Sequence, residues 1–283
     1  MTLDVHGTGA SVLVQDRGRP GWAHLGVPRS GALDRPAADL ANRLVGNDES
    51  DACLEVLMGG LVVSSDVGVW VAVTGARSPV EIDGRVQEFG SALRLVAGST
   101  LRLGTPAAGL RSYVAVAGGI CVDPVLGSRS TDTLGRVGPA PVAAGDRLAV
   151  GSPSGPPASA DTPRPPRPGP LHVLPGPRAD RVAGDALDLL CHTSYVVSPD
   201  SDRVGLRLVG EPLPLAEVTE LPSEGIVLGA VQLPPDGRPL VFLADHPTTG
   251  GYPVVAVVDE PDLWQCAQLR PGEQVRFTRA ATR

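Results

Sequence analysis

The segment from Pro222 to Pro253 constrains the fold more than any other part of this chain. Two apolar runs, IVLGAVQL and PLVFLAD, flank the tetrapeptide Pro-Pro-Asp-Gly at residues 234–237. An Asp-Gly pair favours the positive backbone dihedral angles of a tight hairpin turn, so the two runs are predicted to pair as antiparallel strands. Such a hairpin would bring the polar residues at the two ends of the segment together.

Those polar residues predict a small-molecule site. Glu224 precedes the first strand, and Asp245 ends the second. Gly250 and Gly251 follow, and they let a ligand approach the backbone because glycine has no Cβ. We therefore predict Glu224 and Asp245 as catalytic carboxylates that orient a substrate N–H or act as general base. The substrate-binding residues predicted beside them are Gln232, Thr248, Thr249 and Tyr252.

The rest of the chain also predicts short strands. Residues 67–73 and 113–116 are rich in β-branched side chains, and residues 80–86 contain a second Asp-Gly turn. Helices are a minority. Asp34 is predicted to cap a helix that Gly46 ends, and Pro261 is predicted to open a second helix. We expect a mainly β fold of barrels or sandwiches with a few short helices.

Residues 151–170 are dominated by Pro, Gly, Ser and Ala, and they contain almost nothing to bury. This composition predicts a semi-extended linker. The chain then divides into a β-rich N-terminal half over residues 1–150 and a β-rich C-terminal half over residues 171–283.

Composition excludes several classes of function. All 24 basic residues are arginine, so this chain carries no Schiff-base lysine, P-loop lysine or biotinyl-lysine. A net charge of −7 and only 3% aromatic residues argue against a nucleic-acid surface. The five histidines have no metal-ligand spacing, so no metal site is expected. No apolar run reaches the roughly 18 residues of a membrane span, and no secretory signal is evident, so the cytoplasm is the expected compartment.

Three further polar clusters contain arginines in glycine-rich turns. They are QDRGRPG at residues 15–21, GSRSTD at 127–132 and SDRVG at 201–205. A guanidinium on a fixed backbone can be aimed at a carboxylate or a phosphate. The alternatives are a structural turn with an Asp16–Arg19 pair in the first cluster and solvated loops in the others. The predicted site residues are Asp16, as a third catalytic carboxylate, and Arg19, Arg129, Ser130 and Arg203, as substrate-binding residues.

Taken together, these motifs resemble one family. VQDRGRPGWAHLGVPRSGALDRPAADLANRLVGN, YVAVAGGI, SDRVGLRL and PSEGIVLGAVQLPPDGRPLVFLADHPTTGGYP occur in the order that is typical of the family described as the 5-oxoprolinase C subunit, allophanate hydrolase subunit 2 or biotin-dependent carboxyltransferase. The family also includes the larger member of a bacterial antikinase pair. The resemblance runs from about Val12 to Phe277.

The resemblance implies a cyclophilin-like β-barrel architecture and a small-molecule amide substrate. It also implies partnership with a smaller B subunit, similar to the antikinase inhibitor. Members with 5-oxoprolinase activity add a third protein, the hydrolase A subunit, and use ATP to convert 5-oxoproline to glutamate. In urea carboxylase a similar domain transfers a carboxyl group from biotin held on another domain. A third reading is a regulatory protein that binds the smaller partner without turnover.

The sequence departs from the family pattern in three places. The segment GRVGPAPVAAGDRL at residues 135–148 replaces a more regular glycine-rich loop, which puts the role of that loop in doubt. Val204 stands where methionine is common, and His246-Pro247 replaces a more frequent Arg-Gln type pair. The latter two changes are compatible with altered substrate choice at an intact site.

Overall fold

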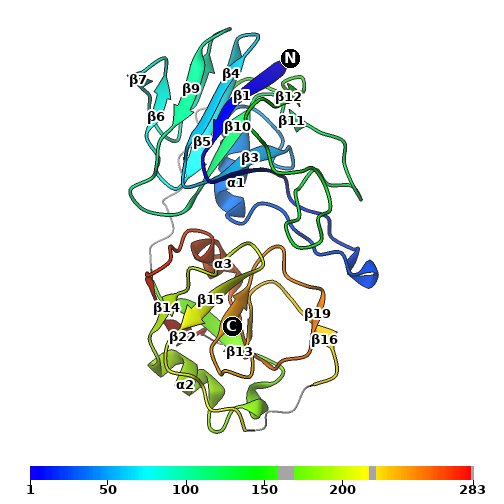
Figure 1. Ribbon diagram of the computed structural model, residues 1–283, viewed down its shortest axis with the longest axis vertical. Helices are drawn as coiled ribbons and strands as arrows, with labels where there is room; N and C mark the ends of the chain where they lie inside the picture. The colour runs from blue at the N-terminus through cyan, green and yellow to red at the C-terminus, as the bar shows by residue number, and fades with distance from the viewer. Residues whose placement is uncertain (159–168, 217–220, 282–283) are drawn as a thin grey trace. The chain divides into compact units, whose positions relative to one another are not determined.

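The computed structural model describes residues 1–158, 169–216 and 221–281 (Figure 1). The chain forms two compact units, which are described separately below. The first unit comprises Met1–Arg19, Ser30–Asp132 and Arg136–Pro165, and the second comprises Pro20–Arg29, Thr133–Gly135 and Pro166–Arg283. The predicted linker over residues 151–170 stays a prediction, because its residues 159–168 lie outside the described part of the chain.

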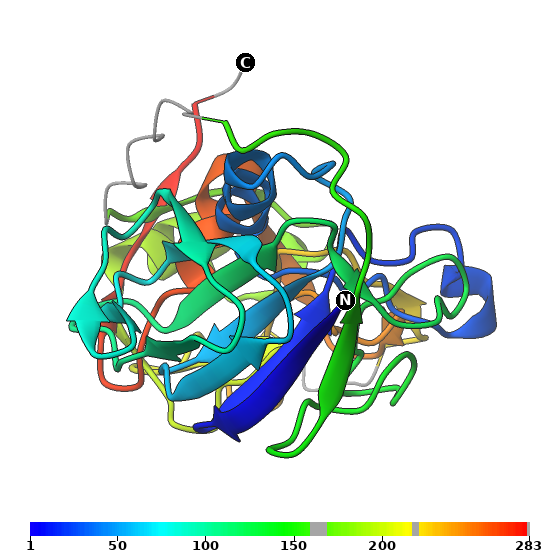
Figure 2. The ribbon, with the colours of Figure 1, turned by 90° about the horizontal axis from the view of Figure 1, so that it is seen from above.

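The first unit contains two antiparallel sheets. One has seven strands in the order β11-β12-β1-β4-β9-β6-β7, and Figure 2 shows its N-terminal strand β1 beside β12. Their bounds are β1 Thr2–Thr8, β4 Leu61–Ser65, β6 Val80–Ile82, β7 Arg85–Val86, β9 Thr100–Leu103, β11 Ile120–Cys121 and β12 Arg147–Val150. The other has five strands in the order β2-β3-β10-β5-β8. Their bounds are β2 Ser11–Gln15, β3 Cys53–Leu57, β5 Val69–Gly75, β8 Ala92–Leu95 and β10 Arg111–Val116.

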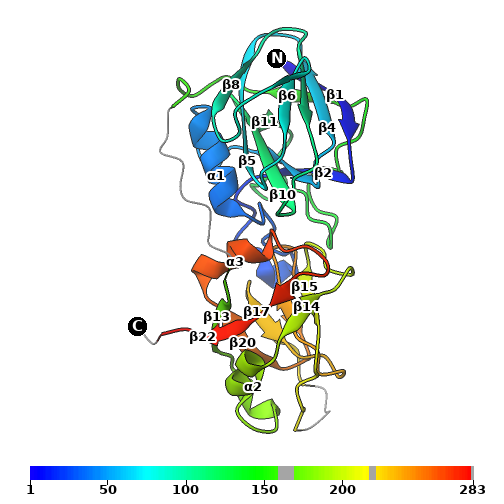
Figure 3. The same ribbon diagram turned by 90° about the vertical axis from the view of Figure 1, so that its left-hand side faces the viewer.

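Helix α1, Arg35–Leu44, packs on β10, β5 and β3 of the five-stranded sheet (Figure 3). Its start agrees with the prediction, since the Asp34 side chain accepts a hydrogen bond from the Ala37 amide. The central strand β10 is buried along its whole length. One hydrophobic core joins residues of both sheets and of α1.

The N-terminus of α1 is fixed to the sheet by the buried hydroxyl of Tyr113. This hydroxyl accepts a hydrogen bond of 2.7 Å from the Asp34 amide and donates one of 2.9 Å to Glu55 Oε2. The same carboxylate oxygen accepts from the Leu33 amide at 3.1 Å, and Arg111 lies 3.5 Å from Glu55 Oε1. A single buried tyrosine therefore joins the helix cap to a charged group within the sheet.

The second unit is built on an eight-stranded sheet in the order β21-β14-β15-β18-β17-β20-β13-β22. Only Arg276 separates the edge strands β21 and β22 in the chain, so the sheet curls into a nearly closed barrel. The bounds are β13 Leu171–Pro175, β14 Tyr195–Val197, β15 Gly205–Val209, β17 Ala230–Gln232, β18 Leu240–Phe242, β20 Val254–Val258, β21 Gln274–Val275 and β22 Phe277–Arg279. A two-stranded ribbon is formed by β16 Glu224–Gly225 and β19 Thr249–Gly250.

The hairpins predicted from Asp-Gly turns are both present. β17 and β18 pair with Val231 opposite Val241, and the Gly237 amide closes the turn on the Pro234 carbonyl oxygen at 2.9 Å. Gly237 has φ of +70°, a value that glycine adopts without strain. The second Asp-Gly turn joins β6 to β7.

The remaining helices are short. α2 spans Ala186–His192 and α3 spans Glu260–Cys266, and the 3-10 turns are η1 Ala23–Leu25 and η2 Ala179–Arg181. The expectation of a mainly β fold with barrel architecture and few helices is confirmed. Over the described residues, none of the helices has the length and apolar composition required to cross a membrane.

Replacing Tyr113 by Phe tests this anchor. The change removes one buried acceptor and one buried donor without altering the shape of the ring, so we expect the free energy of unfolding to fall by about 1–3 kcal/mol. Urea denaturation measures the change. Tyr252→Phe is the matched control, since Tyr252 is 40% exposed, and an equal loss in both variants would contradict the proposed anchor.

Candidate functional site

The ribbon β16–β19 brings together both ends of the segment that predicted a site. Glu224 lies opposite Gly250 and Gly225 lies opposite Thr249, while the Ile226 amide donates to the Thr248 carbonyl oxygen at 3.0 Å. The hairpin between β17 and β18 causes this arrangement, because it turns the chain back on itself. The predicted approach of Glu224 to the two threonines is therefore confirmed for the backbone, whereas the predicted approach of Glu224 to Asp245 stays a prediction.

The Glu224 carboxylate binds Arg178, which the sequence reasoning missed. Arg178 Nε donates to Glu224 Oε2 at 3.1 Å, and Nη2 donates to Oε1. The hydrogen bond from Arg178 and the charges of Arg178 and Arg181 lower the pKa of Glu224. Arg178 follows Pro-Gly-Pro, so the criterion that selected Arg19, an arginine on a Gly- and Pro-fixed backbone, would have found it as well.

Gln232 and Tyr252 adjoin the ribbon. Gln232 is buried, and its Nε2 donates to the Tyr252 carbonyl oxygen at 3.1 Å. A Cβ on Gly250 would lie 2.6 Å from Ile226 Cδ1 and 3.0 Å from Gln232 Nε2, so a larger residue there would require the ends of these two side chains to shift. The backbone pairing thus brings the chain around Glu224 beside Thr248 and Thr249, and the Gln232 side chain reaches the Tyr252 carbonyl group. The substrate-binding roles of Gln232, Thr248, Thr249 and Tyr252 stay predictions.

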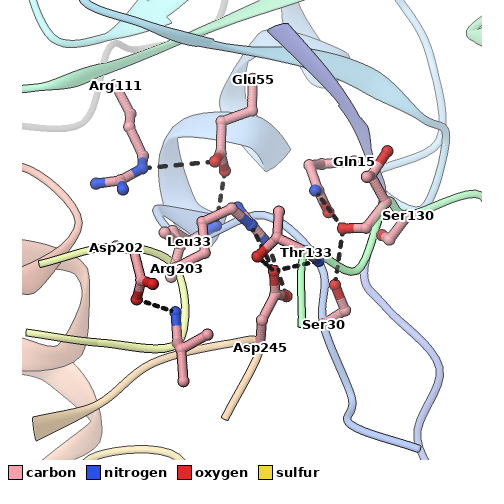
Figure 4. Close-up of polar contacts among 12 residues, drawn as sticks. Gln15, Ser30, Leu33, Glu55, Arg111, Ser130, Thr133, Asp202, Arg203 and Asp245 are labelled. Carbon is pink, nitrogen blue, oxygen red and sulfur yellow. Dashed lines mark hydrogen bonds and ion pairs between the residues drawn. The ribbon is translucent and has the colours of Figure 1, made fainter. Parts of the chain in front are cut away.

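Asp245 and Arg203 form a buried ion pair in the same unit (Figure 4). Arg203 Nε donates to Asp245 Oδ2 at 2.9 Å, and Nη2 donates to Oδ1 at 3.2 Å. The Thr133 amide and hydroxyl add bonds of 3.0 and 2.7 Å to Oδ2. Four hydrogen-bond donors thus stabilise the ionised Asp245 carboxylate. Two roles stay predictions: that of Asp245 as a general base and that of Arg203 in substrate binding.

His246 follows Asp245 and is also buried. Its Nδ1 lies 2.7 Å from the Pro247 carbonyl oxygen, which can only accept, so Nδ1 carries the hydrogen and Nε2 holds the lone pair of the neutral ring. Burial lowers the pKa of His246, while the Pro247 carbonyl and the Asp245 charge oppose that shift. The ring lies 6.1 Å from the Phe242 ring, centroid to centroid.

In the first unit, Asp16 is the centre of a polar cluster at the end of β2. Its Oδ1 accepts from the Gly18 amide at 2.7 Å and from the hydroxyls of Ser128 and Ser130, both at 2.6 Å. Its Oδ2 accepts from the Arg129 amide at 2.6 Å. These bonds hold residues 127–132 against the β2 end, so the two clusters predicted separately from the sequence form one structure.

Arg19 is buried in the same cluster, but it does not pair with Asp16. Its Nη2 donates to the Ser130 carbonyl oxygen and its Nε to that of Val125 at 3.4 Å, so the alternative of an Asp16–Arg19 ion pair is wrong. Arg129 is half-buried, and its Nε donates to the Val122 carbonyl oxygen at 2.9 Å. The substrate-binding roles of Arg19, Arg129 and Ser130 stay predictions.

The Thr131 carbonyl oxygen accepts two side-chain hydrogen bonds, whose donors Gln15 and Ser30 are labelled in Figure 4. Gln15 Nε2 donates to its carbonyl oxygen at 2.8 Å, and the Ser30 hydroxyl donates to the same oxygen at 3.0 Å. Gln15 lies in the first cluster predicted from the sequence, but no role was predicted for it. The sequence reasoning missed Thr133 and Glu55. Glu55 carries a recognisable signal, a lone carboxylate within the apolar run Cys53–Leu57.

All three predicted catalytic carboxylates are bound by hydrogen-bond donors. Asp16 accepts from main-chain amides and serines, Asp245 from Arg203 and Thr133, and Glu224 from Arg178. Such donors stabilise the charged form of a carboxylate. The chemistry that these groups offer is orientation of polar groups by fixed charges. Within residues 1–158, 169–216 and 221–281, His, Cys, Asp and Glu form no group of three able to hold a metal ion.

Comparison with known proteins identifies relatives over nearly the whole chain. The family model described as carboxyltransferase domain, subdomain A and B, matches residues 25–279. The chain is 37% identical to the 5-oxoprolinase C subunit of Escherichia coli over 283 residues, which cover 99% of this chain and 91% of that protein.

Two solved structures have the same fold. The crystal structure of TTHA0988 superimposes with a TM-score of 0.89 at 41% identity, and the match covers 98% of this chain and 55% of that one. The urea amidolyase of K. lactis superimposes with a TM-score of 0.92 at 27% identity, covering 99% of this chain and 19% of that one. This chain therefore corresponds to about half of the first protein and to a smaller part of the second.

Asp245→Asn tests the buried pair of the second unit. The change removes the negative charge beside the buried Arg203, so we expect the free energy of unfolding to fall by about 3–5 kcal/mol. The matched control is Asp202→Asn, since Asp202 is exposed and its Oδ1 accepts from the Val204 and Gly205 amides, as an asparagine oxygen would. We expect the control to change stability by about 0.5 kcal/mol or less, and equal losses would contradict a special role for the pair.

His246 is expected to make stability depend on pH. Its pKa is lowered in the folded chain, whereas the unfolded chain takes up the proton at about 6.5. Stability is therefore lost as the pH falls below about 6.5 and levels off below the folded pKa. Urea unfolding at several pH values should show a smaller loss for His246→Gln than for the wild type. The exposed His192→Gln variant is expected to retain the wild-type pH dependence, and an unchanged slope in His246→Gln would refute the assignment.

Proposed function

Because the chain belongs to the carboxyltransferase family of subdomains A and B, and is similar to the 5-oxoprolinase C subunit, we propose that it is one subunit of an ATP-dependent 5-oxoprolinase. The complex would hydrolyse 5-oxoproline to glutamate. The observation that supports this most is the similarity to the C subunit of the Escherichia coli enzyme over 99% of this chain and 91% of that protein.

The proposed chemistry fits the polar groups of the second unit. A lactam is a poor electrophile, so ATP activates its carbonyl by phosphorylation and water then opens the ring. The chain's own residues bind and orient the substrate: Gln232 and the two threonines supply neutral hydrogen-bonding groups, and the Arg178–Glu224 pair supplies fixed charge. ATP is a substrate of the whole complex, and no residue of this chain is assigned to it.

Activity is proposed to require partners. The relatives are named as one lettered component of 5-oxoprolinase, which implies other subunits, and we propose a smaller B subunit together with a hydrolase A subunit. The TTHA0988 chain extends well beyond the matched part, which agrees with a chain of this kind working beside further protein. The expected compartment is the cytoplasm.

A second candidate is the carboxyltransferase component of a biotin-dependent enzyme that acts on urea or a related amide. The TM-score of 0.92 with the urea amidolyase favours it. Because these 283 residues contain no lysine, biotin would have to be attached outside them. The third candidate, a regulatory partner of a kinase-inhibitor subunit, predicts tight binding to the smaller partner without turnover.

Reconstitution separates these candidates. The chain co-purified with its A and B partners is expected to hydrolyse ATP when 5-oxoproline is added, and to release glutamate in proportion. Each protein on its own is expected to be inactive. Bicarbonate-dependent turnover of urea with a biotinylated protein would favour the carboxyltransferase instead, and a stable complex without any turnover would favour the regulatory role.

The site of the proposed reaction is tested in the same complex. Glu224→Gln and Arg19→Ala together are expected to reduce 5-oxoproline-dependent ATP hydrolysis, since they alter fixed charges in two of the predicted clusters. The double variant must first be shown to assemble with its partners. Unchanged turnover would refute the assignment of these clusters to the substrate.

A further inference from the structure

The Arg178 guanidinium has two edges that can each bind a carboxylate. The side edge, formed by Nε and Nη2, is directed to Glu224. The end edge, formed by Nη1 and Nη2, retains the two Nη1 donors, which have no hydrogen-bond partner among the described residues. The Arg178 side chain is 37% exposed, so a ligand can reach it from solvent.

Both ends of Arg178 are held in place. Its amide donates to the Val254 carbonyl oxygen at 2.9 Å, and the Gly176 amide donates to that of Val255 at 2.9 Å. At the other end, the Glu224 carboxylate fixes the plane of the guanidinium through two parallel bonds. An arginine that is already oriented loses little side-chain entropy when it binds a second carboxylate.

The surroundings suit a small, polar ligand. Glu224 stands on the ribbon opposite Gly250, and the exposed Thr249 occupies the neighbouring position, opposite Gly225. Gln232 Nε2 is engaged with the Tyr252 carbonyl oxygen, which directs the amide group of Gln232 toward the same ribbon. The Gln232 amide at this ribbon and the Arg178 cation bound to Glu224 together offer partners for a lactam ring that carries one carboxylate.

We propose that Arg178 recognises the carboxylate of a small lactam acid through the end edge of its guanidinium, and that Glu224 is a positioning residue that holds Arg178. The inference rests on the proposed function, since 5-oxoproline is such an acid. It also gives Glu224 a role other than the predicted one of general base.

The electrostatics agree with a positioning role. The pKa of Glu224 is lowered, chiefly by its hydrogen bond from Arg178, so the carboxylate stays ionised at neutral pH. A carboxylate with a lowered pKa is a weak proton acceptor at that pH. Arg181 adds a positive charge near Glu224, and Asp180 adds a negative charge near Arg178.

The experiment compares two ligands that differ only in the carboxylate. Calorimetric titration of the complete complex without ATP measures binding of 5-oxoproline and of 2-pyrrolidinone, which has the same ring without the acid. Arg178→Ala is expected to weaken 5-oxoproline binding roughly 10- to 100-fold and to leave 2-pyrrolidinone binding unchanged. Arg178→Lys should restore part of the loss, because it returns the charge but not the two-edged geometry.

The matched control is Arg207→Ala, an exposed arginine on β15 of the same unit, which should bind both ligands as the wild type does. Glu224→Gln tests the positioning role. It should weaken 5-oxoproline binding less than Arg178→Ala does, and its pH–rate profile should retain the wild-type acidic limb. Loss of that limb together with a fall in kcat of roughly 100-fold or more would instead identify Glu224 as the base.

Three results would overturn the carboxylate site. These are equal weakening of both ligands by Arg178→Ala, no weakening of either, and a wild-type complex that binds 5-oxoproline no more tightly than 2-pyrrolidinone. The proposed function fails separately. A complex that binds 5-oxoproline selectively through Arg178 but does not hydrolyse ATP would refute the reaction and leave the carboxylate site standing.

Discussion

The Asp245 carboxylate lies fully buried in the second unit, where two donors from Arg203 and two from Thr133 surround it. A carboxylate buried away from water is stable only when its oxygen atoms accept hydrogen bonds from nearby donors. This requirement organises the polar loops of both units. Asp16 meets it with amides and serines that join residues 127–132 to the end of β2. The Glu224 side chain is 33% exposed, and one arginine is enough to hold it.

The same requirement bears on function. A carboxylate that several donors stabilise is a better anchor than a proton acceptor. The charged residues of this chain are therefore best understood as a framework that fixes arginines and loops in defined orientations. This suits a protein whose proposed reaction derives its chemical driving force from ATP and whose own surface has to hold a small polar amide.

The β-barrel of the second unit provides the rigid support for that surface. The chain connection through Arg276 keeps the edge strands β21 and β22 adjacent, and the β17–β18 hairpin brings the two strands of the ribbon β16–β19 together. Functional side chains held by strand register are placed more precisely than side chains on free loops. Gly250 lies close to this support, because a single added carbon would come within 2.6 Å of Ile226 Cδ1 and 3.0 Å of Gln232 Nε2.

The sequence alone determined the local structure. Asp-Gly turns, the Asp34 cap and the β-branched runs act between near neighbours, so both hairpins, helix α1 and the mainly β class were predictable, and the motifs were sufficient to recognise the family. Only the tertiary structure decided the pairings of charge. Arg178 meets Glu224 across 46 residues, and Thr133 meets Asp245 across 112. Residue types show that each carboxylate needs donors, but which donors reach it depends on strand pairing and barrel closure, which bring together segments that are far apart in the chain.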